Sequence, residues 1–191
     1  WVTYGLGSHN ENLPQFIVLG GPTRADTKES IESNYLGPKY AGIPLQLDPN
    51  NPLPYGNRNA DVLAAEQRNE FELAGKLNQL AAVEYPEDAA VRARIKSYEL
   101  AFNMQMAVPE AIGMTRETQE SQQLYGLDNN NTKVAGQRLL AARRLVERGA
   151  RFVQVYPSPY GVWDSHNSLK TNHATQSAKV DKPVAGLLKD L

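Results

Sequence analysis

Three side chains near the carboxyl end of the sequence have the types and spacing of a metal site. Asp164 and His166 are separated by one residue, and His173 follows seven residues after His166. In an extended loop, residues i and i+2 point the same way, so Asp164 and His166 would face one centre. Carboxylate oxygen and neutral imidazole nitrogen suit zinc, manganese or a similar divalent ion. His173, at the start of the next predicted helix, would complete the set.

The spacing also leaves a structural interpretation open. Asp-x-His is a common tripeptide, and Asp164 and Asn167 suit the caps of turns, in which case the histidines share no role. The third histidine, His9, lies in a Gly-Ser-His-Asn turn beside Glu11 and is expected to be an exposed turn residue.

Other classes of function find little support in the sequence. No cysteine is present, which excludes a thiolate nucleophile, a thiolate metal site and disulfides. There is no Gly-x-Ser-x-Gly nucleophile elbow, and the glycine pairs lack the spacing of a phosphate-binding loop. Lys and Arg number 20 against 21 Asp and Glu, giving a net charge of -1 where a nucleic-acid module would be more basic. No apolar run is long enough to span a membrane.

The elements that must position the candidate site follow an α/β pattern. Residues 13–19 form a short apolar run between turn residues, which predicts a buried strand. Residues 150–156 are rich in β-branched and aromatic side chains and predict a second strand. A helix over residues 133–148 leads into it through Gly149, a typical cap residue. We therefore predict an α/β sheet.

The loop with the candidate ligands comes directly after the strand at residues 150–156. In open α/β sheets, ligands collect beyond the carboxyl ends of the strands. Asp164, His166 and His173 are therefore expected at that edge of the sheet.

Between the two strands lie an irregular stretch and a helical one. Residues 20–59 contain many prolines and little periodicity, which is typical of a functional or covering loop. Apolar spacing predicts helices over residues 60–82 and 86–108, packed as a hairpin. A shorter polar helix is predicted over residues 117–125. We interpret residues 60–126 as a helical insertion within the sheet domain.

The helix predicted over residues 133–148 has two distinct sides. The side expected to face inward carries Ala135, Leu139, Ala142 and Val146. The other side carries Arg138, Arg143, Arg144 and Arg148. We interpret these arginines as a solvated face with cations near the carboxyl end of the helix dipole; anion binding is the alternative.

Several short motifs follow one another along nearly the whole sequence. They are Trp1-Val-Thr-Tyr-Gly-Leu-Gly7, Glu11-Asn-Leu-Pro14, Phe16-Ile-Val-Leu19, Phe102-Asn-Met-Gln-Met-Ala-Val-Pro-Glu110, Ala141-Ala-Arg-Arg-Leu-Val-Glu-Arg-Gly149, Arg151-Phe-Val-Gln-Val155, Trp163-Asp-Ser-His166, Asn172-His173 and Lys182-Pro-Val-Ala-Gly-Leu-Leu-Lys-Asp-Leu191. In this order they resemble the DUF1501 family, a group of sulfatase-like proteins of the alkaline phosphatase superfamily.

The resemblance implies an α/β fold that is part of an α/β/α sandwich of alkaline phosphatase/sulfatase type. It also implies a divalent-metal centre, holding zinc, manganese or calcium, at the carboxyl ends of strands. Asp164 and His166 match the family's Trp-Asp-x-His motif, and His173 matches its Asn-His motif, so all three become metal-ligand candidates. The implied activity is hydrolysis of small-molecule or carbohydrate esters of sulfate or phosphate. The alternative is a non-catalytic sulfatase-like module with a structural or carbohydrate-binding role.

The resemblance bears on the extent and location of the domain as well. The family pattern begins before Trp1 and continues beyond Leu191, so residues 1–191 are expected to form a single partial domain, truncated at both ends. The family also suggests a periplasmic or secreted protein. His9 stands where the family pattern has an acidic residue, which weakens any role for the turn around it.

Overall fold

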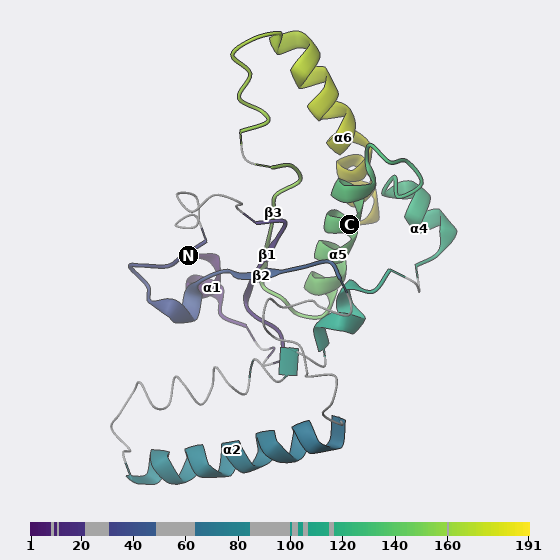
Figure 1. Cartoon of the computed structure of the whole chain (residues 1–191). Helices are drawn as coiled ribbons and strands as arrows, with labels where there is room; N and C mark the ends of the chain where they lie inside the picture. The colour runs from purple at the N-terminus through teal and green to yellow at the C-terminus, as the bar shows by residue number, and fades with distance from the viewer. Residues whose placement is uncertain are drawn as a thin grey trace.

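The computed structural model describes residues 1–8, 10, 12–21, 31–48, 64–84, 100, 103–104, 107–114, 117–159 and 161–191. Within them the molecule is a mixed α/β structure built around a parallel three-stranded sheet (Figure 1).

The central strand of the sheet is β1 (Phe16–Leu19), with β2 (Ile43–Leu45) on one side and β3 (Phe152–Val155) on the other. Both pairings are parallel, and Leu19 lies opposite Leu45 and Val155. Ile17, Val18 and Leu19 are fully buried, because a parallel strand covered on both faces excludes water from successive residues. The two strands predicted from the sequence are confirmed.

Strand β2 lies in the stretch that the sequence predicted to be an irregular loop. Pro44 at its centre lacks an amide hydrogen, which argues against a strand when only the sequence is read. Within the described residues, β2 pairs only with β1 and forms an edge of the sheet, where a proline is tolerated. That stretch therefore contributes a sheet element as well as connections.

Helix α5 (Lys133–Glu147) lies beside the sheet, and α6 (Leu169–Asp190) runs along α5 and extends past it (Figure 1). Ala141 and Leu145 of α5 are buried in the same cluster as the β1 side chains, while Leu140 packs with Tyr125 in a second cluster. The helix therefore buries two faces. Ala135, Leu139 and Ala142 are buried as predicted, but Val146 is exposed and its inward placement was wrong.

Helix α4 (Gln119–Leu124) ends against two glycines of the neighbouring helices. Its N-cap, Thr118, accepts a hydrogen bond from the Ser121 amide, as a polar N-terminus requires. A methyl group added at Gly136 of α5 would overlap the carbonyl oxygen of Tyr125, and one at Gly186 of α6 would lie 2.5 Å from that of Leu124. These glycines therefore let the end of α4 lie directly against both long helices.

The helical stretch between the strands is described only in part. Helix α2 (Ala64–Glu84) confirms the helix predicted over residues 60–82, although residues 60–63 lie outside the described part. Its Leu77 is exposed, and α2 runs apart from the sheet in Figure 1. Most of the second arm of the predicted hairpin, residues 86–108, lies outside the described residues.

The described end of that second arm corrects its predicted boundary. Residues 107–112 are helical, so helical backbone passes through Pro109, before which the helix was predicted to end. Proline cannot donate a helical hydrogen bond, but the Pro109 carbonyl still accepts one from the Gly113 amide at 3.0 Å. In the described part of the chain, no helix is both long and apolar enough to cross a membrane.

Candidate functional site

The loop after β3 carries two of the three predicted metal ligands side by side. The distance from Asp164 Oδ2 to His166 Nε2 is 3.3 Å, so the carboxylate and the imidazole contact each other directly. Their side chains are 74% and 84% exposed, which leaves the pair open to a ligand from solvent. A turn holds the loop, since the Asp164 amide donates to the Gly161 carbonyl at 3.1 Å.

The third predicted ligand, His173, lies in the first turns of α6 and contacts the same loop. Its Nε2 is 2.9 Å from the carbonyl oxygen of Trp163, the residue before Asp164. A carbonyl oxygen only accepts, so Nε2 must carry the hydrogen, and the lone pair of a neutral ring is then on Nδ1. A hydrogen bond of this kind to a backbone carbonyl is what orients metal-binding histidines.

Asp164, His166 and His173 do not form a closed donor set in this conformation. Among the described residues, no three His, Asp or Glu side chains form a group that could hold a metal ion. Asp164 and His166 are paired, while His173 is tied to the loop by its contact with a neighbouring backbone carbonyl. The metal site remains a prediction for these three residues.

A cation missed by the sequence analysis lies at the carboxyl ends of the strands. Arg138 of α5 was predicted to be solvated, but its guanidinium donates to the Tyr156 carbonyl at 2.7 Å, just beyond the end of β3. Burial lowers the pKa of Arg138, because the charged form loses hydration. No local sequence signal separates Arg138 from the other arginines of its helix.

An open depression of about 730 Å³ lies at the opposite, amino-terminal ends of β1 and β3, lined in part by Ser8, Asn10 and Arg151. Its polar groups already have partners. Asn10 Nδ2 donates to the Arg148 carbonyl, and Asn10 Oδ1 accepts from the amides of Asn12 and Leu13. Arg151 Nε donates to the Gly7 carbonyl at 2.8 Å. These contacts hold the start of the chain against the turn between α5 and β3.

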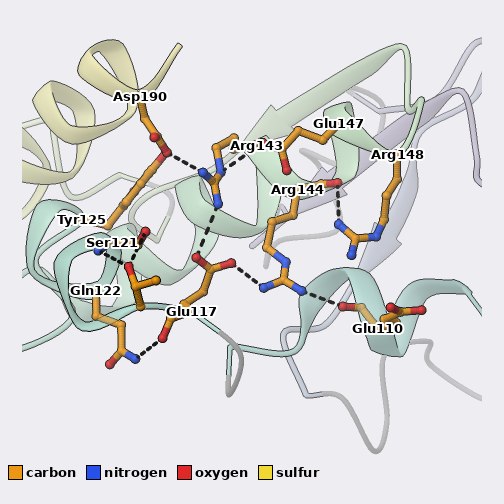
Figure 2. A network of polar contacts seen from close by, with 11 residues as sticks. Glu110, Glu117, Ser121, Gln122, Tyr125, Arg143, Arg144, Glu147, Arg148 and Asp190 are labelled. Atoms are coloured by element: carbon orange, nitrogen blue, oxygen red, sulfur yellow. Dashed lines mark hydrogen bonds and ion pairs between the residues drawn. The ribbon is translucent and has the colours of Figure 1, made fainter.

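Arg143 and Arg144 of α5 correct the prediction of a solvated face. Arg144 is buried and pairs with Glu117 at 2.5 Å, and it also donates to the Glu110 carbonyl (Figure 2). Arg143 shares Glu117 at 3.4 Å and reaches Asp190 of α6 at 2.7 Å. The two arginines therefore join α5 to the segment before α4 through their shared partner Glu117, and Arg143 joins α5 to α6 through Asp190.

Tyr125 is a buried member of the same network. Its hydroxyl donates to Asp190 Oδ2 at 2.8 Å (Figure 2). Burial raises the pKa of the Tyr125 phenol well above its ordinary value, and the hydrogen bond to Asp190 is the second cause of this increase. The folded state therefore holds this proton more tightly than the unfolded state does.

The raised pKa predicts that Tyr125 stabilises the fold less at alkaline pH. The stabilisation is complete below the unfolded pKa of about 10 and falls by up to about 1.4 kcal/mol per pH unit above it. In urea unfolding, Tyr125→Phe should be about 1 kcal/mol less stable than the wild type at pH 7. That difference should shrink above pH 10. Tyr4→Phe, at an exposed position, serves as the control, and a Tyr125→Phe difference that stays constant to pH 11 would refute the assignment.

These features define a mixed α/β protein with a parallel sheet. An exposed loop bearing Asp164 and His166 follows the carboxyl end of strand β3. The chain belongs to the DUF1501 family, described as "Protein of unknown function", which it matches over residues 1–191. Comparison with curated proteins and with solved structures gave no match.

Proposed function

We propose that this chain is part of a metal-dependent hydrolase domain that acts on sulfate or phosphate esters. The observation that carries the proposal is the exposed Asp164–His166 pair, 3.3 Å apart, on the loop after β3. Ligands of open α/β sheets bind beyond the carboxyl ends of strands, which is the position of this loop. The resemblance to sulfatase-like proteins supplies the reaction class and the larger α/β/α sandwich of alkaline phosphatase type.

The donor chemistry of the three residues fits a divalent ion. Asp164 offers a carboxylate, His166 an imidazole, and His173 a nitrogen whose ring is oriented by the Trp163 carbonyl. Two imidazoles favour zinc or manganese over calcium, which prefers oxygen ligands. A bound ion would lower the pKa of a coordinated water and neutralise charge on the ester oxygens. The role of this chain's own residues is to hold and orient that centre.

The proposed substrate is a small-molecule or carbohydrate ester, and the proposed location is periplasmic or secreted. Both proposals rest on the family resemblance. The nucleophile is not assigned to a residue of this chain.

A second candidate is a non-catalytic module with a structural or carbohydrate-binding role. The observation in its favour is that no three donors among the described residues form a metal-holding group. A domain with only two donors at the loop would bind metal weakly and would not need to turn over an ester.

Metal analysis of the Asp164→Ala/His166→Ala double variant tests the proposed centre. Removing two ligands should weaken zinc or manganese binding by at least about tenfold, since even the groups that only orient ligands contribute 10–100-fold. Elemental analysis after dialysis measures this, with His9→Ala/Asp181→Ala as a control of the same residue types. Unchanged metal content in the Asp164/His166 variant would overturn the site.

A screen of aryl sulfate and aryl phosphate monoesters with added zinc, manganese or calcium separates the two candidates. Metal-dependent hydrolysis that is lost in the Asp164→Ala/His166→Ala variant would support the enzyme. Metal binding without hydrolysis of either ester class would favour the non-catalytic module.

A further inference from the structure

Arg138 occupies an unusual position between the ends of two parallel strands. One guanidinium nitrogen donates to the Tyr156 carbonyl, which follows β3. The rest of the group lies against Gly20, which follows β1: a Cβ there would come within 2.5 Å of Arg138 Cζ and 2.6 Å of Nε. The absence of a side chain at Gly20 thus makes room for the guanidinium at the carboxyl edge of the sheet.

Arg138 differs from Arg143 and Arg144 of the same helix because no carboxylate of the described residues lies beside its guanidinium. Arg143 and Arg144 are paired with Glu117, whereas no carboxylate of the described residues forms an ion pair with Arg138. Its hydrogen bond to Tyr156 uses one of the five N–H donors of a guanidinium. Arg138 is half-buried, and taking a charge out of water is costly unless an opposite charge or several hydrogen bonds compensate it. The group is thus equipped to receive an anion.

We propose that Arg138 binds a tetrahedral oxyanion, the sulfate or phosphate group of an ester, between the ends of β1 and β3. The planar guanidinium donates in parallel to two oxygens of such a group, a geometry that a lysine ammonium does not reproduce. The choice of this anion rests on the proposed function, while the existence of an anion site at Arg138 rests on its position and its lack of a paired carboxylate. Gly20 belongs to the site because any larger residue there would displace the guanidinium.

Calorimetric titration of the metal-stripped chain with inorganic sulfate and with inorganic phosphate tests this proposal. Working in a chelator separates anion binding by Arg138 from binding at a metal. The wild type should bind one or both anions more tightly than chloride, and Arg138→Gln should weaken binding by at least about tenfold, the loss expected for a charge-assisted pair. Arg138→Lys should retain an intermediate affinity, because it keeps the charge without the paired donors.

Arg151→Gln is the matched control. Arg151 also donates to a backbone carbonyl, that of Gly7, but at the opposite edge of the sheet. Equal anion affinity in Arg138→Gln and the wild type would overturn the proposal, as would a wild type that binds sulfate and phosphate no better than chloride. If Arg138→Gln does not fold, an Arg138→Lys affinity equal to that of the wild type overturns it instead. Anion binding that depends on Arg138 without any ester hydrolysis would leave this site standing and refute only the proposed hydrolase.

Discussion

Replacing Glu117 by alanine should destabilise the chain by about 3–5 kcal/mol, the usual cost of removing one partner of a buried ion pair. Glu117 is 11% exposed and lies between two guanidinium groups, those of Arg144 at 2.5 Å and Arg143 at 3.4 Å. Without this carboxylate, the buried Arg144 keeps only a carbonyl acceptor, that of Glu110. Urea unfolding followed by circular dichroism measures the change.

Glu147→Ala is the control for the Glu117 variant. Glu147 also pairs with Arg143, at 3.6 Å and one helical turn away, but it is 54% exposed. Water already solvates an exposed pair, so its loss should cost at most about 1 kcal/mol. If the two variants are equally stable, the network does not act as a buried connection between α5 and its neighbours.

Replacing Gly136 by alanine should destabilise the chain by about 1–3 kcal/mol, as expected for an extra methyl in a packed interior. The added Cβ would overlap the carbonyl oxygen of Tyr125. This oxygen belongs to the backbone at the end of α4 and has no rotamer that relieves the overlap. The helix would have to move away from α4, which would also disturb the contact of Tyr125 with Asp190.

Gly75→Ala should have the opposite sign and serves as the matched control. Gly75 lies inside α2, and a Cβ built there meets nothing within 4 Å. Alanine has a helix propensity higher than that of glycine by about 1 kcal/mol, so this variant should be slightly more stable than the wild type. Thermal unfolding compares the two. A stabilised Gly136→Ala variant would show that α4 does not lie against α5 as described.

These two predictions concern the residues of α5 that pack against neighbouring segments of the protein. Arg138 instead lies near the carboxyl ends of the strands. Arg143 and Arg144 serve packing, because their carboxylate partners come from the protein itself. Arg138 has no such partner among the described residues and is the arginine that we assign to a ligand. Of the four arginines first interpreted as one face, Arg143 and Arg144 are thus paired within the protein, Arg148 donates to the Arg144 carbonyl, and Arg138 carries the anion-binding alternative.

The sequence by itself determined the elements whose signals are local. The apolar run around β1, the β-branched run of β3 and the helix ending at Gly149 depend on neighbours within a few residues, and the structure confirms them. The spacing of Asp164 and His166 predicted that both side chains lie on one side of the loop, and their 3.3 Å contact places them next to each other. Local propensity suffices where a residue's partners lie close in the sequence.

Only the tertiary structure decided the features that depend on distant partners. Strand β2 exists because β1 pairs with it, although Pro44 argues against a strand locally. Arg144 is buried because Glu117, 27 residues away, compensates its charge. A helical arginine has the same local sequence signal whether it faces water, a carboxylate or a ligand. Its burial is set by the free energy of long-range contacts, which neither composition nor periodicity records.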